Sequence, residues 1–145
     1  MNQISTQKKS IISRQLLRFL PAILWMAVIF ILSSRTGDEL GSVLPLFQKW
    51  FPWMTDFNWG HFVSYFILAA TLDFGFGARS ERLFMKIVII VLCGLYGVTD
   101  EIHQSFVGGR MMDMTDVRND LIGATIWVIA GSIPFIRRVW RKYFL

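Results

Sequence analysis

Two groups of polar side chains interrupt the apolar stretches of this 145-residue chain, and their spacing suits one helical face each. His61 and Tyr65 are four residues apart, and Asp100 and Glu101 lie four and three residues before Gln104. Side chains at these spacings meet on one side of a helix. Carboxyl and imidazole groups held together are common acids and bases in catalysis. We therefore interpret His61, Asp100 and Glu101 as candidate catalytic residues, with Tyr65 and Gln104 as candidate binding residues.

A third polar group follows a glycine-arginine turn that ends at Arg110. Asp116, Asn119 and Gly123 fall at i, i+3 and i+7 along one helical stripe, and Asp116 is also placed to cap a helix N-terminus. Gly123 would let a neighbouring helix approach closely. The planar guanidinium of Arg110 can hold a carboxylate or a phosphate through paired hydrogen bonds. Arg110, Asp116 and Asn119 thus join the candidate binding residues.

The elements that must position these groups are membrane helices. Hydrophobic residues make up 54% of the chain and the mean hydropathy is +0.48, which exceeds what soluble domains carry. A bilayer core of about 30 Å needs about 20 helical residues. Four apolar stretches meet this length, at residues 16–33, 60–78, 84–106 and 117–136. We expect an all-α membrane protein built as a four-transmembrane-helix bundle.

Basic residues set the orientation of the bundle. The net charge of +5 comes from short clusters between the apolar stretches. The chain therefore offers no soluble basic face that could bind nucleic acid. Lysine and arginine concentrate before the first stretch, between the second and third, and after the fourth. Positively charged loops stay in the cytoplasm, so both termini are expected inside. The sequence then divides into a basic N-terminal segment (1–15), the transmembrane domain (16–136) and a basic tail (137–145).

Two further features bear on the first outer loop and on the single thiol. Residues 44–53 read LPLFQKWFPW, and such aromatic segments settle at the headgroup level, which predicts a short interfacial segment there. Cys93 is the only cysteine, so disulfides and a cysteine zinc cage within one chain are excluded.

The expected depth of the acidic pair in the bilayer is a reason to look for its polar partners. Counting about 1.5 Å per residue from Lys86 places Asp100 about 21 Å up, or roughly 9 Å short of the outer edge of the core. An ionisable group there costs a few kcal/mol unless it has a polar partner. We therefore expect a polar pocket near the outer interface in which His61, Asp100 and Gln104 meet Arg110 and Asp116. The structural alternative is that the acids only hold helices together.

The pattern resembles the VanZ-like membrane protein family. The resemblance rests on His61 with Tyr65, on the segment DEIHQSFVGGR at residues 100–110, and on Asp116, Asn119 and Gly123; residues 33–39 are similar to a further family segment. The chain departs at Gly108, where the family more often has proline, and at Asn58 and Trp59, where lysine is frequent. The family is associated with resistance to the glycopeptide teicoplanin, so the resemblance implies a multi-pass protein of the bacterial cytoplasmic membrane with a role in the cell envelope.

Three functions remain open from the sequence. The first is an enzyme or binder of a phospholipid or lipid-linked headgroup, in which Asp100 or Glu101 acts as base and His61 as acid; whether the chain is an enzyme stays open. The outward N-termini of two helices would favour an anionic group. A metal version would use a divalent ion such as zinc or manganese, bound by His61, Asp100, Glu101, His103 and Asp116.

The second possible function is that of a non-catalytic bundle that modifies antibiotic access, membrane properties or a partner protein. The third, a transporter, lacks the inverted repeat usual for that class.

Overall fold

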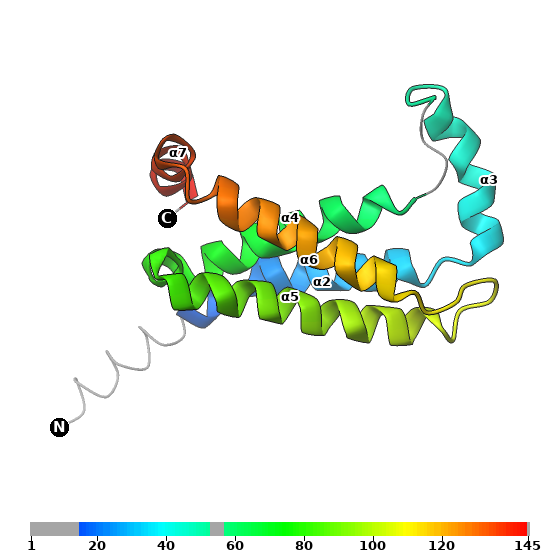
Figure 1. Cartoon of the computed structure of the whole chain (residues 1–145), viewed down its shortest axis with the longest axis horizontal. Helices are drawn as coiled ribbons and strands as arrows, with labels where there is room; N and C mark the ends of the chain where they lie inside the picture. Colours follow the sequence, from blue (N-terminus) through cyan, green and yellow to red (C-terminus); the bar gives the residue numbers. More distant parts are fainter. Residues whose placement is uncertain (1–14, 53–56, 145) are drawn as a thin grey trace.

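A computed structural model describes residues 15–52 and 57–144, and every regular element in these ranges is helical (Figure 1). The elements in chain order are α2 (Leu20–Ser33), α3 (Gly37–Gln48), α4 (Trp59–Phe76), the 3-10 helix η1 (Gly77–Glu81), α5 (Leu83–Gln104), α6 (Met114–Ala130) and α7 (Pro134–Phe144). The helices α2, α4, α5 and α6 run side by side, with α3 at one end of the bundle and α7 at the other (Figure 1). We refer to these as the α3 end and the α7 end.

Three helical stretches are long and apolar enough to cross a membrane, namely Gln15–Ser33, Trp59–Glu81 and Leu83–Gln104. A fourth span is obtained if α6 and α7, which are bent by 91° relative to each other, count as one. Side chains such as Ile23 and Leu95 remain about 60% exposed on the outside of the bundle, as helices surrounded by lipid require. The expected all-α membrane bundle is confirmed, whereas its orientation in the bilayer stays a prediction.

Helix α4 is the centre of the packing, because it contacts α6, α2 and α5, and α6 in turn packs on α5. A Cβ atom added to Gly123 would collide with the backbone carbonyl of Phe62, so the glycine permits the close approach of α6 and α4 that the sequence indicated. Tyr65, Ala69, Cys93 and Ala124 fill the core between these helices. The three helices that bear the polar residues are therefore held in direct contact.

The fourth apolar stretch differs from the expected helix over 117–136. Helix α6 begins at Met114, where the Asp113 side chain caps it by accepting from the Thr115 backbone N–H at 2.7 Å. The interpretation of Asp116 as the N-cap was therefore wrong, since Asp116 lies in the first turn with its side chain turned toward the bundle. The helix ends at Ala130, and Pro134 opens α7 instead of closing the span, because proline fits a first helical turn but not a helix interior.

Helix α3 covers part of the aromatic segment expected in the first outer loop. It starts with a capping box in which Thr36 accepts from the Glu39 backbone and Glu39 accepts from the Thr36 backbone. The exposed fractions of Phe47 and Trp50 are 39% and 83%, and α3 projects away from the bundle (Figure 1). Trp53 lies outside the described residues. Location of this segment at the membrane surface stays a prediction.

Candidate functional site

A histidine between two carboxylates lies at the α3 end, where α4 meets α6. His61 Nδ1 is 2.9 Å from Asp120 Oδ1, and His61 Nε2 is 3.5 Å from Asp116 Oδ2. Asp116 and Asp120 are four residues apart on α6, so both point to the same side and toward the first turn of α4. The side chains of His61 and Asp116 keep 12% and 11% of their surface exposed, while that of Asp120 is fully buried. The pair His61 and Asp116 therefore forms the accessible edge of the cluster.

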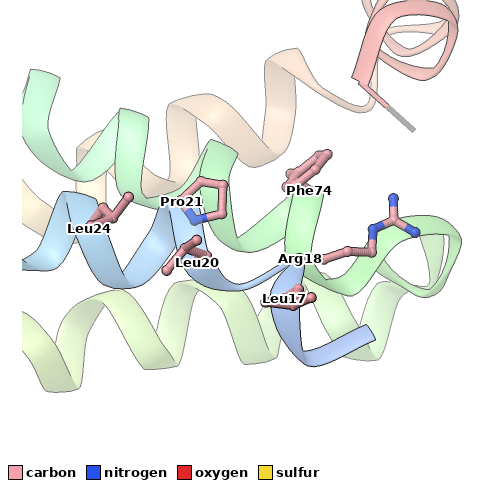
Figure 2. A pocket seen from close by; sticks show the side chains of 6 residues that line it. All are labelled: Leu17, Arg18, Leu20, Pro21, Leu24 and Phe74. Carbon is pink, nitrogen blue, oxygen red and sulfur yellow. The ribbon is translucent and has the colours of Figure 1, made fainter. Parts of the chain in front are cut away.

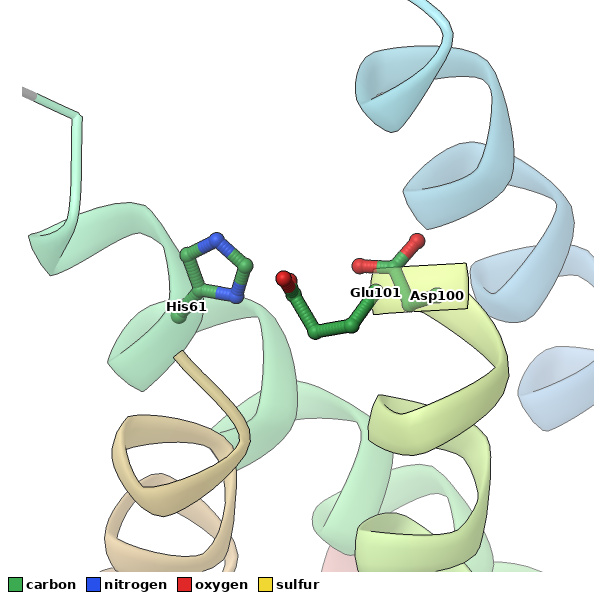
Figure 3. Close-up of side chains that lie close together, drawn as sticks. All are labelled: His61, Asp100 and Glu101. Atoms are coloured by element: carbon green, nitrogen blue, oxygen red, sulfur yellow. The ribbon is translucent and has the colours of Figure 1, made fainter. Parts of the chain in front are cut away.

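Two more carboxylates reach the same place from the last turn of α5. One ligating atom each of His61, Asp100 and Glu101 lies within 4.8 Å of the others, and their side chains approach one another from α4 and α5 (Figure 3). Asp100 and Glu101 are only 3% and 0% exposed. Four carboxyl groups and one imidazole, contributed by His61, Asp100, Glu101, Asp116 and Asp120, thus make up what we call the polar cluster.

Several oxygen atoms of the polar cluster have no hydrogen-bond partner among the described residues. They are Asp100 Oδ1, Glu101 Oε1 and Asp120 Oδ2, and all three are buried. A buried acceptor without a donor costs about 1–3 kcal/mol, and more if it is charged. The cluster is therefore rich in acceptors and poor in donors.

Neighbouring side chains hold the carboxylates in place. Gln104 donates to Asp100 Oδ2 at 3.1 Å and lies 3.5 Å from the Ser33 hydroxyl, which connects α5 to the end of α2. Asn119 donates to Asp116 Oδ1 at 3.5 Å. Tyr65 is fully buried one turn along α4 from His61, and its hydroxyl has no partner in the described part of the chain. These predicted binding residues all lie at the polar cluster or one helical turn from it.

Among the described residues, the side chains of Arg110 and His103 make no hydrogen bond or ion pair with the polar cluster. The Arg110 side chain is half-buried and makes no hydrogen bond or ion pair within residues 15–52 and 57–144. His103 faces α2, where it stacks on Phe30 at 4.1 Å between ring centroids and lies 3.5 Å from the Ser34 hydroxyl. The predicted ligand set therefore needs correction, because the side chain of His103 is on another face of α5.

The turn before α6 adds a contact that the sequence did not indicate. Glu101 Oε2 accepts from the Asp113 backbone N–H at 2.8 Å, so the acidic pair is tied to the start of α6. The Thr115 backbone N–H that donates to the Asp113 carboxylate holds the pKa of Asp113 below its usual range. This cap and the Glu101 contact together fix the first turn of α6, from which Asp116 reaches His61.

Asp120 is the member of the polar cluster that was left out of the predicted site. It makes the shortest contact with His61, and the signal that could have found it is its i, i+4 spacing from Asp116. Gly97 on α5 makes room for it, since a Cβ atom there would lie 2.5 Å from Asp120 Oδ2.

A second polar network at the α7 end was also missed. Arg137 on α7 contacts both carboxylate oxygens of Asp73, at 3.0 and 2.8 Å, and the Ser80 hydroxyl at 2.8 Å. Trp127 donates to the same carboxylate at 3.3 Å, and Glu81 lies 3.5 Å from Arg137. Every charge in this network has an opposite partner, so it is a structural attachment for α7.

An apolar pocket of about 420 Å³ also lies toward the α7 end, between the start of α2 and α4 (Figure 2). It is lined by Leu17, Arg18, Leu20, Pro21, Leu24 and Phe74, and the Arg18 guanidinium lies 5.2 Å from the centre of the Phe74 ring. Its lining contains no acid or nucleophile. The candidate site is therefore the polar cluster.

Comparison with known proteins gives a family and no closer relative. No curated protein and no solved structure matches the chain. The model of the VanZ/LLP1 family matches residues 19–135, a range that begins before α2, ends within α7 and includes all of the polar cluster. With most of its length matched, this helical chain with three to four candidate membrane spans belongs to the VanZ/LLP1 family.

Proposed function

We propose that this protein acts in the cytoplasmic membrane of a bacterial cell envelope, where its polar cluster binds or processes the anionic headgroup of a phospholipid or a lipid-linked precursor. The observation that carries the proposal is the contact of His61 with two carboxylates beside the acidic pair of α5. A link to glycopeptide resistance, including teicoplanin, is part of this proposal because lipid-linked cell-wall precursors display their headgroups at the outer surface.

The chemistry available at the cluster is proton transfer. An imidazole within hydrogen-bond distance of a carboxylate can be oriented by it and can pass a proton to or from a bound group. Asp120 holds one ring nitrogen of His61, and Asp116 lies at the more exposed side where a headgroup would enter. In this proposal His61 acts as the acid and Asp100 or Glu101 acts as the base.

Binding of an anionic group must overcome the negative charge of the carboxylates. The N-terminus of α4 begins at Trp59, two residues before His61, and directs backbone N–H groups toward this end of the bundle. Arg110 is the basic residue of the loop between α5 and α6, and its guanidinium has no ion-pair partner among the described residues. In this proposal these two features receive the phosphate.

A second candidate function is supported by the contacts that cross between helices. Glu101 binds the backbone before α6, and Gln104 lies between Asp100 of its own helix and Ser33 of α2. A non-catalytic bundle would use the polar cluster only to hold these helices together, while the protein alters antibiotic access, membrane properties or a partner protein.

Isosteric substitutions distinguish the two functions, because Asp100→Asn and Glu101→Gln keep an acceptor for each observed hydrogen bond and remove the charge. We expect both variants to reach wild-type levels in the membrane and to lose the effect of the protein on the cell. Retention of phosphatidylglycerol, seen by native mass spectrometry of the detergent-solubilised protein, should instead fall in Arg110→Ala, which removes the cation that receives the phosphate. Teicoplanin susceptibility of cells that express each variant gives the second measurement.

Glu39→Gln is the matched control. Its carboxylate is about half exposed on α3 and the glutamine retains the capping contact, so lipid retention and susceptibility should be unchanged. If instead Asp100→Asn and Glu101→Gln remove the protein from the membrane, the non-catalytic function is favoured. Equal lipid retention in wild type and in folded Arg110→Ala would contradict headgroup binding at this end of the bundle.

A further inference from the structure

We propose that His61, Asp100 and Glu101 bind a divalent cation, either Mn²⁺ or Zn²⁺. The three side chains offer one nitrogen and two carboxylate oxygens, a donor set that suits these two ions. They come from two different helices, and the bundle itself brings them together (Figure 3).

The spacing of the donor atoms is close to what one ion requires. Bonds from Zn²⁺ to nitrogen or carboxylate oxygen are about 2.1 Å, so the tetrahedral geometry of zinc places two donors about 3.4 Å apart. The three donor atoms of the site lie within 4.8 Å of one another. Binding of one ion would therefore require the carboxyl groups to turn toward it.

The unpartnered oxygen atoms are an independent reason to expect a ligand. Asp100 Oδ1 and Glu101 Oε1 are buried in side chains that are 97% or more inaccessible, and no donor in the described residues reaches them. A divalent cation would satisfy both atoms and would balance two negative charges that are otherwise costly at this depth in a membrane. The unbalanced negative charge of the site and the spacing of its donor atoms thus both favour a divalent cation.

One nitrogen of His61 would bind the ion, and each of the two faces a carboxylate of α6. Nδ1 faces Asp120 and Nε2 faces Asp116, so whichever nitrogen binds, the other one keeps a carboxylate partner. Histidine ligands in metal sites commonly donate their second N–H to a carboxylate, which fixes the ring and strengthens the ligand. The competing arrangement is an imidazolium that donates to both carboxylates and leaves no lone pair for a metal.

A bound ion would also explain how an acidic site receives an anionic group. This extension rests on the proposed function: the cation would bridge the two carboxylates of α5 to a headgroup phosphate, as divalent ions do in phosphoryl-binding sites. The accessible edge at His61 and Asp116, whose side chains are 12% and 11% exposed, is the side from which the phosphate would reach the ion.

Electron paramagnetic resonance of Mn²⁺ tests the site directly. The full chain is placed in phosphatidylcholine nanodiscs, which supply no anionic lipid, and is titrated with Mn²⁺ after treatment with EDTA. We expect one bound ion per chain and a nitrogen coupling from imidazole. The chain has only two histidines, so His61→Asn should abolish the nitrogen coupling and His103→Gln, the matched control at the same end, should keep it. Affinity should fall about 10- to 100-fold in Asp116→Asn, which loses a carboxylate beside the ring.

Three results would overturn the proposal. They are no bound Mn²⁺ or Zn²⁺ in the wild type, a bound ion without nitrogen coupling, and equal binding by wild type and by folded Asp100→Asn. Because the first two are measured on the wild type alone, they hold even if a variant fails to fold. A separate titration with phosphatidylglycerol nanodiscs, with and without EDTA, tests headgroup binding apart from metal binding. Metal binding without lipid retention would contradict the proposed function but would still support the cation site.

Discussion

At the scale of single residues, the polar cluster depends on small side chains as much as on charged ones. Asp120 is fully buried against α5 and reaches His61 only because Gly97 leaves space for its carboxylate. Any side chain at position 97 would push Asp120 away from the ring nitrogen that it faces. Gly97 on α5 therefore helps to set the position of His61 on α4.

Gly97→Ala is expected to destabilise the protein by about 1–3 kcal/mol, the usual cost of overfilling a packed interior. The added Cβ would lie 2.5 Å from Asp120 Oδ2, so either the carboxylate or the helix pair must move. Unfolding by SDS in mixed micelles measures the change. Gly41→Ala is the control, since nothing lies within 4 Å of a Cβ there, and it should leave stability unchanged or slightly raised. A neutral effect of Gly97→Ala would show that the contact between Asp120 and α5 is not tightly packed.

At the scale of elements, α7 is the least expected feature and the network at its start explains its direction. The helix has exposed apolar side chains such as Phe135 and Tyr143 together with four basic residues. Arg137 fixes it to α4 through Asp73 and to η1 through Ser80. An amphipathic basic helix at about a right angle to the bundle suits the membrane surface, where its apolar face contacts lipid and its charges contact headgroups.

Arg137→Ala should destabilise the chain by about 3–5 kcal/mol, because it leaves the nearly buried Asp73 carboxylate without its ion-pair partner. Arg137→Lys should recover only part of the loss, since an ammonium cannot reproduce the paired contacts to Asp73 and the contact to Ser80. Arg138→Ala, at an exposed position of the same helix, is the control. Protease sensitivity of α7 and thermal unfolding in detergent measure both effects. Equal stability of the Ala variants at 137 and 138 would exclude an anchoring role for Asp73.

At the scale of the whole molecule, polar groups occupy the two ends of the bundle and apolar side chains the middle. The polar cluster at the α3 end is rich in carboxylates, whereas the α7 end has arginines paired with Asp73 and Glu81. This distribution agrees with a cytoplasmic α7 end, because basic segments are retained inside.

Reporter fusions test this orientation. Fusions at Ser80 and after Leu145 should report the cytoplasm, and fusions near Asp56 and Met112 should report the outside, following the lysine and arginine bias of the connecting segments. Alkaline phosphatase and green fluorescent protein fusions at the same positions provide opposite signals. A cytoplasmic signal at Met112 would place the polar cluster at the inner surface and would remove the basis for headgroup binding at the outer leaflet.

The sequence by itself determined the class of the protein and most of its helices. Apolar stretches of about 20 residues leave no alternative to membrane helices, because unpaired backbone groups are too costly in lipid. The spacing of His61, Asp100 and Asp116 also sufficed to assign each to a helix face. Such local information depends only on periodicity and hydropathy, and both are properties of the chain before it folds.

Only the tertiary structure decided which polar groups meet. The rotation of α6 against α4, set by the contact at Gly123, brings Asp120 as well as Asp116 to His61. The direction of α5 takes His103 away to α2. The position of α7 depends on an ion pair between Asp73 and Arg137, which are 64 residues apart. Helix rotation and long-range pairing depend on side-chain packing between helices. The pattern of residues along one helix does not determine this packing.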